Sequence, residues 1–462
     1  MSRSGFRFSS LAFALTLLPI CLNASLAQTV TEVYDFDGIA GAQPENVQLI
    51  QGQDGQLYGS TAFGGTNGLG AIFKITPAGH ATLLHSFNGT DGENPYAGLT
   101  LGVDGNFYGT ALIGGTAGAG VLFRMTPAGA FTVLHNFMDN DTDGGSPSSP
   151  PILAADGNFY GTAQLGGPTA NGVVYKYVPG EALTIIYNFQ GPDGAAPLFS
   201  PTQGGDGSLY VPAYEGGNGQ CGTIVKMSTS GIASNTFTFD CARGRNPFGP
   251  LYQAPDGSLY GAAQAGGVNS QGVLFKLSQN FDYSVLHNFG ATVNDGADPG
   301  GGVIQATDGK LYGVAFRGGA PEAGTIYSYA AAGIGRYNTI FTFQNRNDAD
   351  GEFVQHTNGL LYGVTTDGGA NGSGTVYSLN VGLGPFVALV RYQGRIGSTV
   401  QILGQGFTGT TSVTLNGVGA SFTVVRDTYL TAVVPAGATS GPVVVTTPAG
   451  TLKSNKNFRV NP

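Results

Sequence analysis

The sequence predicts an all-β protein, a seven-bladed β-propeller followed by an Ig-like β-sandwich. Three observations carry this prediction: a phrase that recurs seven times at nearly constant spacing, 78 glycines among 462 residues, and a C-terminal stretch in which apolar and polar residues alternate. Frequent glycine suits short strands joined by tight turns. A hydrophobic fraction of 41% is too high for a disordered glycine-rich chain, and the length exceeds what one compact core accommodates.

The first 27 residues predict a secretory signal peptide. Arg3 and Arg7 form a basic start, an apolar run extends from about Leu11 to Leu22, and small residues precede a cleavage point after Ala27. The run is shorter than the roughly 20 residues that a membrane-spanning helix needs. We therefore expect an exported protein, secreted or held at the bacterial cell surface, with no membrane span in the mature chain.

Charge narrows the classes of partner. Removing residues 1–27 leaves 17 basic and 28 acidic residues, a net charge of −11. A chain this acidic and with so few charges overall is a poor match for nucleic acid or for an anionic membrane. We expect a monomer that binds a glycan or a protein and needs no cofactor.

The recurring phrase is typified by "DGNFYGTALIGGTAGAGVLFRMTPAG", which begins at Asp104. Its tyrosine recurs at spacings of 50 or 52 residues, at Tyr58, Tyr108, Tyr160, Tyr210, Tyr260, Tyr312 and Tyr362. Each copy divides into a short apolar strand, an Asp-Gly hairpin turn, a second strand, a Gly-Gly loop, a third strand and a fourth strand. Four antiparallel strands in about 50 residues make one propeller blade.

The fourth strand ends on a phenylalanine that also occurs seven times, at Phe36, Phe87, Phe137, Phe189, Phe239, Phe289 and Phe343. The first of these precedes the first Asp-Gly phrase, and the seventh phrase, through "GTVYSLN", has no such strand after it. We therefore expect Val30–Phe36 to pair beside Gly374–Leu379, which closes the ring and removes an open sheet edge.

Cys221 and Cys241 are the two cysteines that remain after signal cleavage. The first precedes the third strand of the fourth copy and the second follows its fourth strand. Because neighbouring antiparallel strands bring such ends together, and because an exported chain with two cysteines favours oxidation, we predict a disulfide. Closing a loop of about 20 residues is worth roughly 3 kcal/mol in the chain-entropy description.

The phrase "DG-x-[LF]-YG…GG…G-x-[VI]-[FY]-K" resembles the GloVer type of tandem repeat found in exported bacterial proteins, over roughly residues 30–380. The resemblance implies export and a repeat fold, and it implies no defined chemistry. We place the propeller at residues 28–380.

Residues 381–385 ("VGLGP") predict a linker, and residues 386–462 resemble the IPT/TIG Ig-like domain. The resemblance rests on short matches along this stretch: Gly404, Gly406, Phe407, Val413, Asn416, Gly417, Val434, Pro435 and Phe458. Domains of this kind are commonly appended to extracellular proteins as spacers or adhesive modules.

Two repeated slots invite a functional interpretation. His85, His135 and His287 share one position of the fourth strand, but the aligned copies carry Tyr34, Tyr187, Phe237 and Phe341 there. Since a metal ligand needs a lone-pair donor, we interpret the slot as aromatic packing. Basic residues share a slot of the third strand, which we interpret as water-facing: Lys74, Arg124, Lys176, Lys226 and Lys276.

The stretch "DNDTDGG" matches the start of a calcium loop, with Asp139, Asp141 and Asp143 as candidate oxygen ligands. The distal Glu of a complete loop is missing, and aligned copies also carry an Asp-Gly pair, as at Asp91 and Asp295. An acidic turn is the alternative interpretation.

No set of catalytic residues stands out. A catalytic site breaks the repeat symmetry, and the acids and base that do so are scattered: Glu93, Glu215, Arg317, Glu322 and Glu352. The turn aspartates resemble the Asp-box of sialidase propellers, but the chain has no Trp for that motif. The expected function is therefore non-enzymatic binding of a glycan or protein outside the cell. The alternative is a polysaccharide hydrolase or lyase that uses the propeller funnel, which converging carboxylates would favour.

Overall fold

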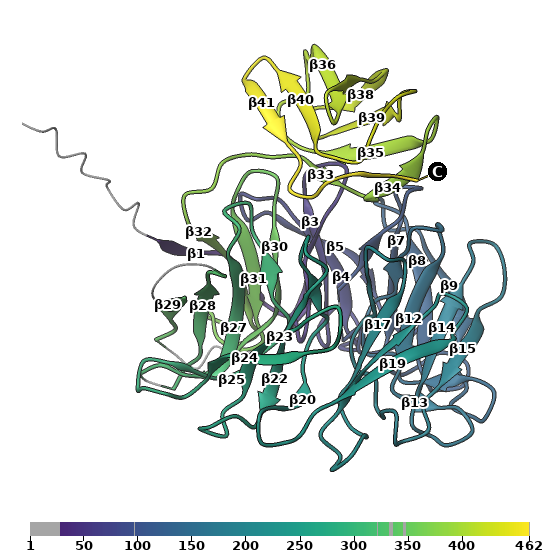
Figure 1. Ribbon diagram of the computed structural model, residues 1–462, viewed down its shortest axis with the longest axis vertical. Coiled ribbons are helices and arrows are strands. Elements are labelled where there is room, and N and C mark those ends of the chain that lie inside the picture. The colour runs from purple at the N-terminus through teal and green to yellow at the C-terminus, as the bar shows by residue number, and fades with distance from the viewer. Residues whose placement is uncertain (1–27, 97, 321, 332–335, 345–347, 462) are drawn as a thin grey trace, which may run out of the picture.

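The computed structural model describes residues 28–96, 98–320, 322–331, 336–344 and 348–461. These residues form β-strands and no α-helix. The predicted signal peptide, residues 1–27, lies outside them. Figure 1 shows the repeat region as one body and the C-terminal domain, drawn in yellow, seated on one end of it.

Each repeat forms one antiparallel sheet, numbered here 1 to 7 along the chain. Sheet 1 consists of β2 (Ile50–Gln51), β3 (Leu57–Thr61), β4 (Ala71–Ile75) and β5 (Ala81–Ser86). Sheet 2 consists of β6 (Thr100–Leu101), β7 (Phe107–Ala111), β8 (Val121–Met125) and β9 (Phe131–Asn136). Sheet 3 consists of β11 (Ile152–Leu153), β12 (Phe159–Ala163), β14 (Val173–Tyr177) and β15 (Thr184–Asn188). Sheet 4 consists of β16 (Thr202–Gln203), β17 (Leu209–Ala213), β18 (Thr223–Met227) and β19 (Ala233–Thr238). A separate small ribbon pairs β10 (Gly144–Gly145) with β13 (Leu165–Gly166).

Sheets 5 and 6 each gain a fifth strand. Sheet 5 consists of β20 (Arg245–Pro247), β21 (Tyr252–Gln253), β22 (Leu259–Ala265), β23 (Val273–Leu277) and β24 (Tyr283–Asn288). Sheet 6 consists of β25 (Gly296–Pro299), β26 (Ile304–Gln305), β27 (Leu311–Gly318), β28 (Thr325–Tyr329) and β29 (Tyr337–Thr342). Sheet 7 combines the two ends of the repeat region: β30 (Ala349–Gln355), β31 (Leu361–Thr365), β32 (Thr375–Asn380) and β1 (Thr29–Asp35).

The second and third strands of each sheet form the core. In β7 all five residues are buried, and in β8 all but Arg124 are buried. Strands covered on both faces carry continuous apolar runs instead of alternation, which is why "FYGTA" and "VLFRM" show no period of two. Neighbouring sheets meet through stacked rings, as where Tyr58 stacks on Phe107 with centroids 4.1 Å apart.

The glycine after the repeated tyrosine makes room for an aromatic ring from the third strand. A Cβ at Gly109 would lie 2.5 Å from the Phe123 ring. Sheet 4 departs from the phrase at Val211, and the residue paired with it is Val225 instead of an aromatic. The two departures compensate, because a valine side chain fills the space that the missing ring would have taken.

The ring closure predicted from the sequence is confirmed. β1 pairs antiparallel with β32, with Thr29 opposite Asn380 and Asp35 opposite Thr375. The backbone N–H of Phe36 donates to the carbonyl of Gly374 at 3.0 Å. Figure 1 shows the two strands side by side although about 350 residues separate them in the chain.

The predicted disulfide joins Cys221 to Cys241, with their Cα atoms 5.3 Å apart. Its position follows from the antiparallel register, in which Thr223 at the start of β18 lies opposite Thr238 at the end of β19. The bridge therefore ties the Gly-Gly loop of sheet 4 to the connection toward sheet 5.

The described residues of the C-terminal domain form ten strands, several of them only two or three residues long. One sheet consists of β33 (Ala388–Leu389), β35 (Thr399–Leu403), β39 (Tyr429–Val433) and β38 (Phe422–Arg426), and the other of β37 (Val418–Gly419), β36 (Ser412–Leu415), β40 (Val443–Thr447) and β41 (Gly450–Lys453). A parallel pair, β34 (Gln393–Arg395) and β42 (Arg459–Asn461), completes the domain. A single buried cluster that includes Phe407 and Phe458 lies between the sheets.

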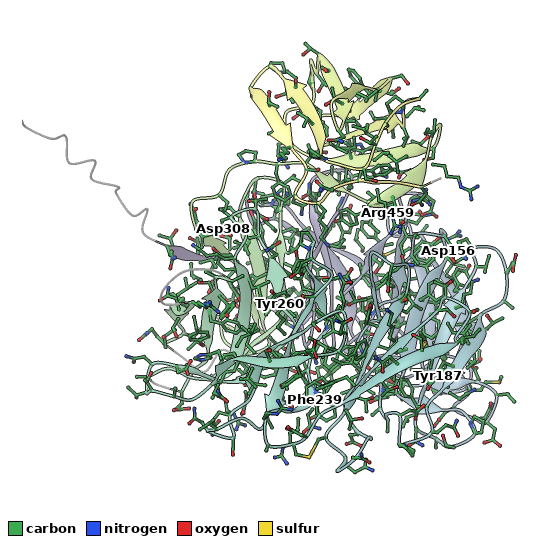
Figure 2. All side chains as sticks on the ribbon, viewed as in Figure 1. Asp156, Tyr187, Phe239, Tyr260, Asp308 and Arg459 are labelled. Atoms are coloured by element: carbon green, nitrogen blue, oxygen red, sulfur yellow. A yellow bond between two sulfur atoms is a disulfide. The ribbon has the colours of Figure 1, made fainter. Side chains whose placement is uncertain are left out.

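The repeat region has two unlike faces. The turn face carries the hairpin turns between first and second strands, at Gly55, Gly105, Gly157, Gly207, Gly257, Gly309 and Gly359. The loop face, at the opposite end of the strands, carries the Gly-Gly loops and the connections between sheets. In Figure 2, Asp156 and Asp308 mark the end next to the C-terminal domain, and Phe239 lies toward the other end.

Candidate functional site

The turn face carries a hydrogen bond that five of the repeats form within their own phrase. Alternation on a strand brings residues four apart to the same side, so the turn aspartate accepts a hydrogen bond from the repeated tyrosine. This pair forms at 2.7–3.3 Å in Tyr58–Asp54, Tyr108–Asp104, Tyr160–Asp156, Tyr210–Asp206 and Tyr312–Asp308. The aspartate thus has a structural role, as its position in a hairpin turn suggested.

The basic slot of the third strand completes this arrangement. The Lys226 ammonium lies 2.8 Å from the Asp206 carboxylate and 5.4 Å from the centroid of the Tyr210 ring. Burial acts to raise the pKa of Asp206, but the bond from Lys226 and the N–H of Ser208 outweigh it and hold this pKa below its usual value. The lysine side chain keeps 24% of its surface exposed, so the slot is a partly solvated ion pair.

The C-terminal domain covers the turn face. Leu403 and Tyr429 of that domain join a buried cluster with Tyr58 and Leu101 of the repeats. Polar contacts surround this cluster: Thr428 donates its hydroxyl to the Gln53 carbonyl at 2.7 Å, Gln405 donates to the Thr357 hydroxyl at 2.9 Å, and Arg459 donates to the Gly205 carbonyl. Figure 2 places Arg459 at this boundary. A ligand on the turn face would have to displace the domain.

The loop face is built around a strained residue in each repeat. These residues have φ between 35° and 57°, although none is glycine: Gln43, Asn94, Ser146, Ala196, Asn246, Asp298 and Asp348. Five of them lie before the first strand of their sheet, and Asn246 and Asp298 lie inside β20 and β25. The backbone of six of them reaches back to the preceding sheet, as where the Asn94 N–H donates to the Leu69 carbonyl at 2.9 Å. Left-handed backbone costs a non-glycine residue about 1–2 kcal/mol, so these inter-sheet bonds hold the side chains in fixed positions.

Side chains on the loop face differ from one repeat to the next. The position four residues after the repeated tyrosine is Ala62, Leu112, Gln164, Tyr214, Gln264, Phe316 and Thr366 along the chain. In sheets 4 to 6 this variation gathers aromatic rings. Phe248 makes edge-to-face contacts with Phe199 at 4.7 Å, with Phe316 at 5.7 Å and with Tyr214 at 6.3 Å between centroids.

A pocket of about 140 Å³ lies beside this aromatic group, lined by Gln264, Asp298, Phe316, Arg317 and Asp348. The Arg317 guanidinium lies 3.4 Å from the Asp298 carboxylate. Burial raises the pKa of Asp298, Arg317 lowers it, and the nearby charge of Glu322 raises it. This pocket is the strongest candidate site of the loop face, because it combines an aromatic wall with several polar groups.

The central cavity is lined by residues from all seven repeats, including Asn46, Ser149, Ser200 and Glu352. Gln48 donates to the Glu352 carboxylate at 2.9 Å. Burial raises the pKa of Glu352 to about 8, against a lowering influence of Lys456 from the C-terminal domain. The cavity measures about 50 Å³, which is room for a few water molecules at about 10–15 Å³ each.

A second buried acid, Asp350, lies near Glu352 in β30. Asp350 accepts hydrogen bonds from the N–H of Asn46 at 2.8 Å and from the N–H of Gly351 at 2.6 Å. Burial nevertheless raises its pKa to about 7. Asp350 and Glu352 are therefore two acids of sheet 7 with raised pKa values, each held by different partners.

The histidine slot pairs with aspartates that the sequence interpretation left unconnected to it. His135 lies 3.0 Å from Asp143, and His287 lies 3.0 Å from Asp295. The rings also pack, since His287 stacks on Tyr337 with centroids 3.5 Å apart. The packing interpretation is thus supported, with a hydrogen bond across the inter-sheet connection in addition. Aligned Tyr187 donates to Asp193 in the same way.

The candidate calcium ligands Asp139, Asp141 and Asp143 differ in burial. Asp143 is buried and engaged by His135 and by the N–H groups of Met138 and Gly144. Among the described residues, no group of three or more His, Cys, Asp or Glu side chains is arranged to hold a metal ion. Calcium binding by these three aspartates stays a prediction from the sequence.

The residues that break the repeat symmetry fall into separate places. Arg317 and Glu322 lie near Asp298 at the loop-face pocket, and Glu352 lines the central cavity. Glu93 pairs through its backbone with Ile113, and Glu215 with Ala195, in the loops of other repeats. The signal that the sequence interpretation missed is the aromatic substitution at Phe316 and its neighbours, which an alignment of the seven copies contains.

Comparison with models of known protein families shows to which family the repeats belong. The model of the Gloeobacter/Verrucomicrobia repeat matches residues 21–151, 101–294 and 280–420. The chain belongs to this family. The model of the IPT/TIG domain matches residues 386–460, so the predicted C-terminal domain is present. No curated protein matches the sequence.

Two solved structures share the fold of the repeat region. Virginiamycin B lyase from Staphylococcus aureus is similar with a TM-score of 0.51 and 12% identity, covering 76% of this chain and 98% of its own. The BP39L lectin from Burkholderia pseudomallei is similar with a TM-score of 0.52 and 10% identity, covering 75% and 99%. At such low identity these likenesses establish a β-propeller-like fold and carry no activity to this chain.

The described residues contain no helix long and apolar enough to cross a membrane. The disulfide between Cys221 and Cys241 is in keeping with an oxidising, extracellular location.

Proposed function

We propose that this protein is an exported, non-enzymatic binding protein that acts outside the cell or at its surface. The seven sheets are the blades of a closed seven-bladed propeller, and the loop face receives a glycan or a protein. The observation that carries the proposal is the asymmetry of the two faces: the C-terminal domain occupies the turn face, while the loop face presents aromatic and polar side chains that differ between repeats.

The propeller and the IPT/TIG domain then have distinct roles. The domain closes the turn-face side of the ring and spaces the propeller from whatever lies beyond it. The protein works as a monomer, because each blade offers a second copy only the short edge of its outermost strand. Its net acidic charge directs it away from nucleic acid.

The test is a printed array of neutral and acidic oligosaccharides, probed with the labelled chain from residue 28 to its end. Selective, saturable binding that the same free oligosaccharide competes away is expected. No binding on the array, together with no saturable binding to a panel of purified extracellular proteins, contradicts the proposal.

A second function is favoured by one observation, the raised pKa values of Asp350 and of Glu352, which lines the central cavity. Proton donors of this kind suit a polysaccharide hydrolase or lyase. The size of the cavity argues against it, because about 50 Å³ admits a few water molecules and no sugar ring. Release of reducing ends or of unsaturated products from a polysaccharide panel, lost in Glu352→Gln, would establish the enzyme instead.

A further inference from the structure

We propose that the loop-face pocket lined by Gln264, Asp298, Phe316 and Arg317 is a subsite for a single neutral sugar residue of the bound glycan. This inference rests on the proposed binding function and names where and by which chemistry the ligand is held.

The pocket has the size that one sugar residue requires. Its volume of about 140 Å³ holds roughly ten water molecules, close to the number of non-hydrogen atoms in one hexose. The central cavity is nearly threefold smaller. The pocket lies between sheets 5, 6 and 7 at the loop face, where no part of the C-terminal domain reaches among the contacts of the described residues.

Phe316 supplies the apolar wall. It lies at the end of β27 and is braced by the edge-to-face contact with Phe248, so its ring orientation is set before any ligand arrives. Sugar rings present a face of C–H groups with partial positive charge, and this face is attracted to the negative face of an aromatic ring. The equivalent residue of sheet 2 is Leu112, which offers a similar position without a ring.

The polar groups are held in place by bonds outside the pocket. Tyr214 donates its hydroxyl to the Gln264 carbonyl oxygen at 2.9 Å, which orients the amide and leaves its NH₂ group as a donor. The Asp298 backbone is fixed at φ 52° by the bond from its N–H to the Gln271 carbonyl at 2.9 Å. Fixed side chains lose little entropy on binding.

The Asp298–Arg317 pair supplies both an acceptor and a donor fork. Two hydroxyls on neighbouring carbons of a sugar ring present a donor and an acceptor at matching spacing, so one can donate to the carboxylate while the other accepts from the guanidinium. The pair is open to solvent on one side, since 63% of the Arg317 side chain is exposed. An incoming hydroxyl therefore reaches it without breaking buried contacts.

The charge of the pocket selects among sugars. The Asp298 carboxylate already engages the one guanidinium, Arg317, and Glu322 adds a further negative charge near Asp298. A uronic acid or another acidic sugar would meet net repulsion, so the subsite takes neutral hexoses.

The experiment begins with the array on the chain from residue 28, followed by titration with the methyl glycosides of glucose, galactose and mannose and with methyl glucuronoside. The variant Phe316→Ala is compared with Leu112→Ala, the matched change at the equivalent position of sheet 2. We expect Phe316→Ala to weaken binding of the neutral glycan about tenfold and Leu112→Ala to leave it unchanged. Methyl glucuronoside should not compete.

A second variant, Arg317→Ala, keeps the test decisive if Phe316→Ala lowers the yield of folded protein, because Arg317 is mostly exposed. It should also weaken binding about tenfold or more, with an unchanged melting temperature. Binding of a glycan that neither variant alters overturns the subsite while the proposed function stands. Preference for an acidic sugar also overturns it. If no oligosaccharide on the array binds, the glycan subsite is refuted, and this holds also if a purified protein binds saturably instead. If neither an oligosaccharide nor a purified protein binds, the proposed binding function is refuted as well.

Discussion

The turn face and the loop face of the repeat region are made from the same seven copies, yet they are opposite in character. On the turn face the copies are nearly identical, with the Asp–Tyr pair repeated from sheet to sheet. On the loop face the backbone repeats, down to one left-handed residue in each sheet, while the side chains vary. The comparison shows that the repeated residues build the fold. The residues that differ between copies lie at loop-face positions whose side chains are not required for that fold.

The largest expected effect comes from breaking the cover of the turn face. Leu403 is 5% exposed and packs in the cluster that joins the two domains. Leu403→Ala should cost about 2–5 kcal/mol and separate the unfolding of the C-terminal domain from that of the repeats in calorimetry. Val433→Ala, at an exposed position of β39, is the control. One unchanged transition in Leu403→Ala would mean that the turn face does not depend on this contact.

A smaller effect is expected on the loop face, where the disulfide reinforces sheet 4. Replacing both Cys221 and Cys241 by Ser should lower the free energy of unfolding by roughly 3 kcal/mol, measured by denaturant titration. The wild-type protein in reducing buffer should fall to the same value as the variant. Equal stability of oxidised and reduced protein would show that the loop face is already held by its inter-sheet bonds.

The acids between the two faces predict a dependence of stability on pH. Burial raises the pKa of Glu352 to about 8, above the value of about 4.3 in an unfolded chain. Between these two values the folded state holds the proton and the unfolded state has released it, so stability falls as the pH rises from about 4 to 8. Below pH 4 both states are protonated and the contribution is complete.

The variant that isolates this group is Glu352→Gln, whose amide oxygen can still accept the bond from Gln48. Its stability should match the wild type near pH 4 and exceed it at pH 8.5, because the amide does not titrate. Denaturant titrations at the two pH values measure the difference. Identical pH profiles would show that the carboxyl titrates as an ordinary solvated acid.

The smallest effect is expected from the repeated ion pairs of the turn face. Lys276 lies 3.3 Å from Asp256, with 32% and 58% of the two side chains exposed. Lys276→Ala should change the free energy of unfolding by a few tenths of a kcal/mol, measured in low and high salt. A loss above about 1 kcal/mol would mean that the aliphatic stem of the lysine, packed over Tyr260, carries more than the charge does.

The framework could be predicted from the sequence because its causes are local. Asp-Gly turns, five-residue apolar strands and a fixed period determine the sheets, and the offset of the Phe36 strand determines the closure through β32. The disulfide followed from the register of two neighbouring strands. The pairing of His135 with Asp143 did not, because it crosses a connection whose path depends on the next sheet.

The candidate site could not be predicted in the same way. Gln264 and Phe316 occupy the same repeat position in sheets 5 and 6, but Asp298 occupies a different position, and the period of the repeat does not show that these three side chains meet. They meet because the left-handed residue at or before each first strand carries the backbone from one sheet to the next. The covering of the turn face was equally inaccessible, since neither domain alone shows which surface receives the other.

The pairing of β1 with β32 also bears on how such a protein changes over evolutionary time. The repeating unit of the sequence and the sheet are out of phase by one strand, so the repeat region begins and ends inside a single sheet. A duplication or deletion of one unit of about 50 residues therefore falls between intact sheets and leaves the shared one untouched. Rings with more or fewer members can arise from this gene without inventing a new closure, and each added copy brings a fresh set of loop-face side chains free to diverge.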